Sequence, residues 1–278
     1  MRVDAHHHVW TLAHRDQPWI DESMSAIRRD FTIADLAPLA ASSEVDKTVL
    51  VQTVTVPEET PELLALAART DLVGGVVGWV DLTAPSAADD IAALLARPGG
   101  QWLRAIRHQV QGEPDPWWLC RDDVRRGLRA VFDAGLLYEL LVLPHQLPAA
   151  IRTVSAFADA PFVLDHCAKP PIALGELGSW AGDIRRLARE PNVVCKLSGL
   201  VTEAAWTMWT VDDLREAVDT VLDAFGPDRL AFGSDWPVCL LAAEYHEVIA
   251  AAEAVTAQLS PDEREAIFAG TATRVYRL

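Results

Sequence analysis

The chain has 278 residues, half of them hydrophobic, so it can bury a substantial core. Its formal net charge of −16 disfavours binding to nucleic acid, to acidic membrane surfaces and to strongly anionic substrates. No apolar run approaches the roughly 18 residues that a membrane span requires, and no signal-peptide pattern is present. We therefore expect a soluble, cytoplasmic protein whose four widely spaced cysteines are reduced packing residues.

Apolar, β-rich segments alternate with helical patterns along the whole chain. We predict strands at residues 2–9, 46–54, 72–82, 102–110, 137–143, 162–166, 193–197 and 229–233. We predict helices at residues 33–42, 60–69, 86–96, 122–133, 147–157, 179–189, 211–225 and 244–259. Eight strands, each followed by a helix, within about 250 residues predict an α/β fold of the (β/α)8 TIM-barrel type. No linker or internal repeat divides the chain, so residues 1–278 are expected to form a single domain.

Three consecutive histidines lie at the end of the first predicted strand. Successive side chains of a strand point to opposite faces, so His6 and His8 share one face and His7 points away. A doubly wound sheet, the competing fold, would have a glycine-rich phosphate turn at this place. Two imidazoles about 7 Å apart along one strand face can bind one metal ion or one substrate oxygen.

The carboxyl ends of the strands meet at one mouth of a barrel, where barrel enzymes place their active sites. Several predicted strands end there in polar residues, and four of these are the predicted metal ligands: His6, His8, His166 and Asp235. Imidazoles with one carboxylate are a ligand set of catalytic zinc, with one position left for water or substrate. We predict one divalent ion, with zinc expected, and a catalytic role for all four residues. Asp235 would also take the proton of the attacking water.

Other residues near the mouth are predicted to contact the substrate: Arg107, His108, Lys196, Trp10 and Trp236. Arg107 and His108 would bind substrate oxygens, the alternative being a salt bridge and a capped loop. Lys196 is either a substrate donor or the partner of a buried carboxylate. Two long segments, 11–30 and 111–120, follow strand ends and are expected to form lids or pocket walls. Glu113, in the second segment, is a candidate for a further metal ligand.

Several motifs of this chain resemble the amidohydrolase superfamily. They are DAHHHVW at 4–10, RHQVQGEPDPWWL at 107–119, LVLPHQLP at 141–148, VLDHCAKPPI at 163–172, VCKLSGLVTE at 194–203 and FGSDWPVCLL at 232–241. More narrowly, they resemble its sugar-lactonase branch, which includes L-fuconolactonase and L-rhamnonolactonase and is related to 2-pyrone-4,6-dicarboxylate lactonase. The resemblance covers nearly the whole chain. It implies a distorted (β/α)8 barrel that opens the ring of an aldonolactone with water.

The resemblance leaves open the number of metal ions, the need for a metal and the identity of the substrate. The fourth strand has no lysine that could bridge two metal ions, which disfavours a binuclear centre. The dicarboxylate lactonases work without a metal, and the three histidines would then polarise the carbonyl directly. A neutral sugar lactone is the expected substrate, because a dicarboxylate would need several arginines at the mouth and only Arg107 is evident there. The alternatives are a metal-dependent decarboxylase of the same superfamily, acting on an aromatic or keto acid, and a barrel that binds sugar acids without turnover.

Overall fold

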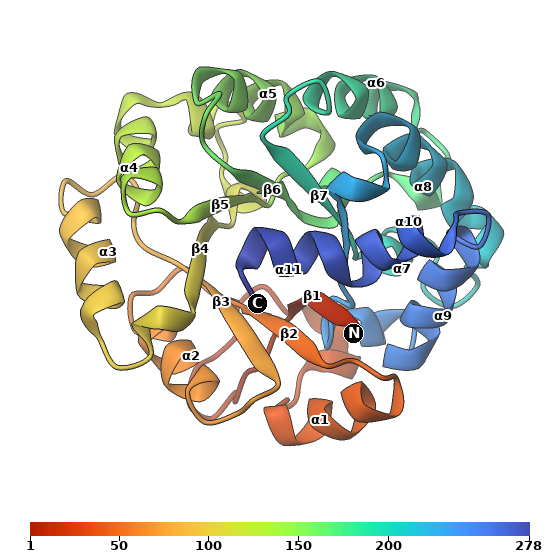
Figure 1. The fold of residues 1–278 in the computed structure, drawn as a ribbon, viewed down its shortest axis with the longest axis horizontal. Coiled ribbons are helices and arrows are strands. Elements are labelled where there is room, and N and C mark those ends of the chain that lie inside the picture. The colour runs from red at the N-terminus through yellow and green to blue at the C-terminus, as the bar shows by residue number, and fades with distance from the viewer.

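The computed structural model describes residues 1–278 and has eight parallel strands, paired in chain order around a barrel (Figure 1). The strands are β1 (Val3–His7), β2 (Lys47–Val51), β3 (Val73–Gly78), β4 (Leu103–His108), β5 (Leu137–Leu140), β6 (Phe162–Leu164), β7 (Val193–Leu197) and β8 (Leu230–Phe232). The first and last strands close the ring, because the His8 amide donates to the Trp236 carbonyl at 2.7 Å and the Asp235 amide donates to the His6 carbonyl at 2.8 Å. The predicted (β/α)8 barrel is confirmed.

Helices form a ring around the strands (Figure 1). The helices of the chain are α1 (Ile33–Ser42), α2 (Glu59–Ala67), α3 (Ala87–Ala96), α4 (Asp122–Asp133), α5 (Leu147–Ala156), α6 (Gly178–Leu187), α7 (Leu200–Glu203), α8 (Val211–Phe225), α9 (Tyr245–Val255), α10 (Pro261–Glu265) and α11 (Thr271–Tyr276), and α11 lies outside this ring. Three helices, α1, α4 and α8, and one strand, β7, have the predicted bounds. Most other strands end earlier than predicted, because the chain leaves the sheet to build the loops of the mouth. No helix has the length and apolar character needed to cross a membrane.

The last part of the chain, which the sequence pattern left unassigned, closes the amino end of the barrel. After α10 the chain runs through one π-helical turn into α11, which lies across the barrel opening (Figure 1). Ala272 and Tyr276 of α11 are buried against the strands, and Leu278 packs over the start of β3 at Gly74. This end of the barrel is therefore a packed core and no channel.

The inside of the barrel has an apolar layer and a polar layer. A cluster of small and β-branched residues from the strands fills the amino half together with α11, and it includes Val3, Val49, Val77, Ala105, Leu137, Val163, Val194 and Ala231. Because side chains alternate along a strand, the residue two positions further on points to the same side. On four consecutive strands that residue is charged: Arg107, Glu139, Asp165 and Lys196. All four are almost fully buried.

All four cysteines are free, and Cys167, Cys195 and Cys239 are buried. They are packing residues of the strands and the mouth loops, as predicted. None has a disulfide partner.

Candidate active site

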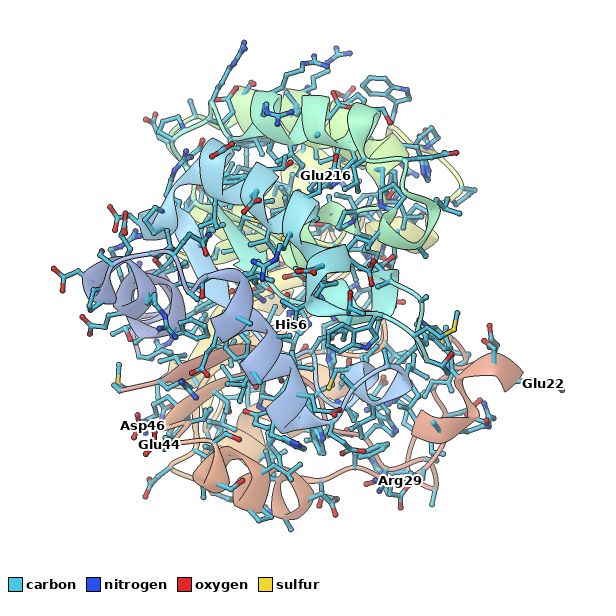
Figure 2. The ribbon with its side chains drawn as sticks, turned by 90° about the vertical axis from the view of Figure 1, so that its right-hand side faces the viewer. His6, Glu22, Arg29, Glu44, Asp46 and Glu216 are labelled. Carbon is cyan, nitrogen blue, oxygen red and sulfur yellow. The ribbon has the colours of Figure 1, made fainter.

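The three histidines and the carboxylate predicted as metal ligands converge at the carboxyl end of the barrel. His6 Nε2 lies 3.1 Å from His8 Nε2 and 3.7 Å from Asp235 Oδ1. The same carboxylate oxygen lies 3.5 Å from His8 Nε2 and 3.9 Å from His166 Nε2. The side view shows His6 deep within the molecule, far from the surface residues Glu22 and Arg29 (Figure 2). The donor atoms of His6, His8 and Asp235 all lie within 4.8 Å of one another, and His166 adjoins this group through Asp235 Oδ1.

The donor atoms of His6, His8 and Asp235 are spaced to bind one small divalent cation. Ligand distances of about 2.0–2.1 Å in a tetrahedral zinc site place neighbouring donor atoms roughly 3.3 Å apart, close to the separations found here. His8 Nδ1 donates to the Val51 carbonyl at 2.8 Å, so its Nε2 carries a lone pair that faces the cluster. Asp235 Oδ1 is buried and has no hydrogen-bond partner. A bound cation would compensate this oxygen for the missing hydrogen bond.

The electrostatic surroundings give these groups the protonation states that such a site needs. Burial lowers the pKa of His166 to about 4. Burial, aided by the Lys196 ammonium, lowers the pKa of His6 well below its usual range. Burial alone would raise the pKa of Asp235, but the nearby His166 and His8 lower it overall. At neutral pH the two imidazoles are therefore uncharged and the carboxylate is ionised.

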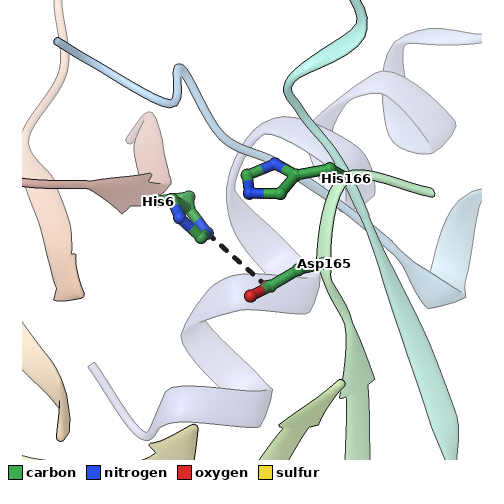
Figure 3. A group of neighbouring side chains, drawn as sticks. All are labelled: His6, Asp165 and His166. Atoms are coloured by element: carbon green, nitrogen blue, oxygen red, sulfur yellow. Dashed lines mark ion pairs between the residues drawn. The ribbon is translucent and has the colours of Figure 1, made fainter. Parts of the chain in front are cut away.

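A second group of potential ligands shares His6 with the first. His6, His166 and Asp165 have donor atoms within 4.8 Å of one another (Figure 3). The dashed ion pair in Figure 3 joins His6 Nδ1 to Asp165 Oδ1 at 3.5 Å. Asp165 Oδ1 and Lys196 Nζ, the latter 3.1 Å from His6 Nδ1, thus both border the nitrogen of His6 that faces away from the first group.

An unusual backbone turn presents His166. Four consecutive residues, His166, Cys167, Ala168 and Lys169, have positive φ angles of 49°, 51°, 57° and 52°. Left-handed backbone costs an L-residue about 1–2 kcal/mol, so the turn needs support from its surroundings. The buried Trp180 indole donates to the Cys167 carbonyl at 2.8 Å.

The loop after β7 completes this support. Ser198 Oγ lies 2.9 Å from His166 Nδ1, which leaves Nε2 pointing at the cluster. Gly199 has φ +66°, and a Cβ at this position would lie 2.7 Å from His166 Nδ1. Only glycine combines this backbone angle with this close approach. Ser198 and Gly199 thus hold the His166 ring in this orientation, Ser198 through its contact with Nδ1 and Gly199 by leaving room for the ring.

The charged layer beneath the histidines decides the roles of Arg107 and Lys196. Arg107 Nη1 lies 3.0 Å from Asp165 Oδ2 and 3.3 Å from His6 Nε2, and its side chain borders the cavity. Lys196 Nζ lies 2.7 Å from Glu139 Oε2, 3.0 Å from Asp165 Oδ1 and 3.1 Å from His6 Nδ1. Lys196 is fully buried and does not line the cavity, so it is the partner of buried carboxylates and no substrate donor.

A cavity of about 240 Å³ opens onto His8, His166 and Asp235, three of the predicted metal ligands. Trp19 and Met24, from the first long segment, form part of its wall, as predicted for residues 11–30. The second long segment contributes Gln111. The remaining wall includes the side chains of Lys169, Thr202, Glu203 and Trp206.

Three predicted substrate contacts, in addition to Lys196, are corrected by the structure. His108 follows Arg107 on β4 and therefore points to the opposite side, where it stacks on Trp118 with ring centroids 4.2 Å apart. His108 Nε2 lies 2.8 Å from Glu113 Oε1, which also removes Glu113 from the candidate ligands.

Trp10 and Trp236 belong to the core beside the mouth. The Trp10 indole donates to the Arg29 carbonyl at 2.7 Å, and Trp236 packs edge-on against Phe31. Both are buried, and neither lines the cavity.

Sequence reasoning missed three residues of this site. Asp165 could have been found, because it lies two positions after the inward-facing Val163. Lys169 and Glu203 carried no such signal, since a left-handed turn and the short helix α7 do not produce a periodic pattern.

The comparisons agree with this geometry. Residues 3–278 match the model of the amidohydrolase family Amidohydro_2. A curated L-fucono-1,5-lactonase from Burkholderia multivorans is 41% identical, with 100% of this chain and 96% of the relative covered. A crystal structure of an amidohydrolase from Burkholderia multivorans with bound zinc is 40% identical and has a TM-score of 0.95, with 100% and 99% covered. A probable 2-pyrone-4,6-dicarboxylic acid hydrolase from Acinetobacter baumannii, crystallised with citric acid, is 18% identical with a TM-score of 0.79 and 100% and 99% covered, which shows a shared fold alone. This chain belongs to the amidohydrolase family.

Proposed function

We propose that this protein is a lactonase that hydrolyses a neutral sugar lactone of the L-fucono-1,5-lactone type. The observation that carries the proposal is the ionised, unpartnered Asp235 carboxylate facing three histidines at the bottom of a cavity. The full-length similarity to an L-fucono-1,5-lactonase supports the same reaction.

The charge balance of the cavity supports a neutral substrate. Arg107 is neutralised by Asp165 at 3.0 Å, and Lys169 is neutralised by Glu203 at 3.1 Å. Since each cation already has a carboxylate partner, no free cation remains for an acidic substrate.

Asp235 is the proposed general base. Its carboxylate removes a proton from water as the water oxygen bonds to the lactone carbonyl carbon. The bond from this carbon to the ring oxygen then breaks, and Asp235 returns the proton to the departing alkoxide. The product is the open-chain hydroxy acid.

The proposed metal ligands are the same four residues, namely His6, His8, His166 and Asp235. When bound, one divalent ion would polarise the lactone carbonyl and lower the pKa of the attacking water. Zinc is the proposed ion, because it fits the donor set and is bound in the similar Burkholderia multivorans structure. Arg107, held by Gln52 and Asp165, lies 3.3 Å from His6 Nε2 and would position this ring beside the substrate.

The decarboxylase alternative is less well supported. An aromatic or keto acid carries a carboxylate that needs an unpaired cation, and both cavity cations, Arg107 and Lys169, are paired. Binding without turnover would give no reason for the buried Asp235 oxygen that lacks a partner.

A hydrolysis screen tests the proposal. The purified protein is incubated with a panel of aldonolactones and a pH indicator, beside aromatic acids assayed for release of carbon dioxide. Acid release from a neutral sugar lactone is expected. Loss of carbon dioxide, or binding without any product, would contradict the lactonase assignment.

A further inference from the structure

An ion pair between Lys169 and Glu203 forms part of the cavity wall. Lys169 Nζ lies 3.1 Å from Glu203 Oε1, and the two side chains are 25% and 23% exposed. They come from different parts of the chain, Lys169 from the turn after β6 and Glu203 from the end of α7. Both line the cavity that contains Asp235.

The left-handed turn explains why Lys169 is there. In a helical turn, residues three positions apart lie on the same side, and this holds for either hand. His166 and Lys169 accordingly both face the cavity, whereas Cys167 and Ala168 between them are fully buried. The strained turn therefore ties the position of Lys169 to that of the proposed ligand His166.

The pair keeps hydrogen-bonding capacity that a ligand can use. The single hydrogen bond between the two side chains engages one Lys169 N–H and Oε1 of Glu203. Two ammonium N–H groups and Oε2 remain available. Such a donor beside an acceptor, about 3 Å apart, matches two neighbouring hydroxyls of a sugar ring.

An aromatic side chain stands on the same wall. The Trp206 indole donates to the Thr202 carbonyl at 2.8 Å, which fixes its orientation, and Trp206 lines the cavity. An indole face suits the C–H groups of a sugar ring. We infer that Lys169, Glu203 and Trp206 form the subsite that binds a vicinal diol of the sugar lactone. This inference rests on the proposed function and names the part of the site that recognises the sugar.

The same pair gives the subsite selectivity against acidic sugars. Glu203 cancels the charge of Lys169, so a carboxylate on the substrate meets a carboxylate instead of a free ammonium. Removing the Glu203 charge should weaken the contact with a diol and improve the contact with an acid. A purely structural ion pair would produce neither change.

The experiment compares three lactones with wild-type protein and the variant Glu203→Gln. The lactones are a neutral aldonolactone, its deoxy analogue lacking one of the two diol hydroxyls, and a lactone bearing a uronic carboxylate. Glu203→Gln should lower kcat/KM for the neutral lactone roughly tenfold or more, as expected for a lost hydrogen bond to a charged group. It should leave the deoxy lactone nearly unaffected, and it should raise the relative rate with the acidic lactone.

Two further variants make the result decisive. Lys169→Gln should likewise reduce the preference for the neutral lactone over its deoxy analogue. Asp183→Asn removes the carboxylate of an exposed ion pair on α6, with Arg186 at 2.9 Å, and should leave all three rates unchanged. Thermal unfolding establishes that each variant is folded.

Binding of a non-hydrolysable aldonolactam, measured by calorimetry on wild-type protein and Glu203→Gln, distinguishes a failure of the proposed lactonase function from a failure of the proposed diol subsite. A wild-type protein that binds the lactam but cleaves no lactone would overturn the proposed function. Equal lactam affinity in both proteins, or an unchanged ratio between the neutral and the deoxy lactone, would overturn the diol subsite. Weaker lactam binding by Glu203→Gln is the expected result.

Discussion

The two ends of the barrel use the same strands for opposite purposes. At the amino end, Val163 and Val194 belong to an apolar cluster that α11 covers. Two residues further along the same strands, Asp165 and Lys196 form a buried ion pair at 3.0 Å beneath the histidines.

Left-handed backbone angles are also distributed unevenly between the two ends. The carboxyl end contains the left-handed residues from His166 to Lys169 and the left-handed Asp235, whereas the only other left-handed non-glycine residues are Glu44 and Arg277. Backbone strain and buried charge both cost stability, and both are concentrated where the chemistry lies. The amino end of the barrel therefore stabilises the fold, whereas the carboxyl end holds a rigid site at a cost in stability.

The largest effect is expected from removing the metal ion. Prolonged chelation followed by elemental analysis should give metal-free protein without lactonase activity, and zinc should restore the activity at about one equivalent per chain. The apolar end needs no ion, so circular dichroism should show that the barrel persists. Full activity in demonstrably metal-free protein would mean that the histidines act on the carbonyl oxygen directly.

The second effect concerns the base. Asp235→Asn keeps the shape of the side chain and removes the proton acceptor, so kcat should fall by roughly 10²-fold or more. In metal-free protein the unfolding temperature should hardly change, because Asp235 Oδ1 has no hydrogen bond to lose. Near-normal turnover in the folded variant would exclude Asp235 from the mechanism.

The third prediction moves a ligand without removing it. Gly199→Ala forces a methyl group against the His166 ring, where the Cβ would lie 2.7 Å from Nδ1. A displaced catalytic group typically costs one to two orders of magnitude, so kcat/KM should fall roughly 10- to 100-fold. A crystal structure of the variant should show a shifted His166. An unshifted ring with normal kinetics would contradict the proposed positioning.

The fourth prediction targets the opposite end. Val163→Ala removes buried methyl groups from the apolar cluster and should lower the free energy of unfolding by about 2 kcal/mol. Denaturant titration measures this loss, while kcat/KM should stay within about twofold of the wild-type value. A large loss of activity without a loss of stability would contradict the assignment of stability to the amino end and of the site to the carboxyl end.

The smallest effect is a pH dependence at the boundary between the layers. Burial, together with Asp165, raises the pKa of Glu139 to about 7, although Lys196 opposes the shift. A folded-state pKa above the ordinary value of 4.5 means that the related stability is complete below 4.5 and is lost as the pH rises through 7.

The unfolding temperature of the wild type should therefore fall more steeply between about pH 5 and pH 8 than that of Glu139→Gln. Parallel curves for the two proteins would show that Glu139 is ionised throughout.

Much of this contrast could be predicted from the sequence, because it follows from regular periodicity. The strand–helix alternation predicted the barrel, and the polar residues at strand ends predicted the convergence of His6, His8, His166 and Asp235. The same reasoning misplaced His108, since it assumed that every polar residue at a strand end faces the mouth. Applying the two-residue alternation from Arg107 would have turned His108 outward.

The remaining parts had no periodic signal. Lys169 reaches the cavity through positive φ angles at non-glycine residues, which the residue types do not predict. The helix α11 is too short for an amphipathic pattern, and its role depends on the closed barrel beneath it.

The closure between the first and last strands has a consequence for protein synthesis. Asp4, near the start of the chain, accepts hydrogen bonds from Ser234, 230 positions later, and the His6 carbonyl accepts one from the Asp235 amide. During translation, His6 and His8 leave the ribosome more than 220 residues before Asp235, whose carboxylate would complete the proposed site. Contacts over such sequence separation form slowly, so the nascent barrel passes through a long stage with an open edge. A ribosome-bound chain that stops before β8 should therefore bind neither metal ion nor lactone, whatever structure its first seven strands have formed.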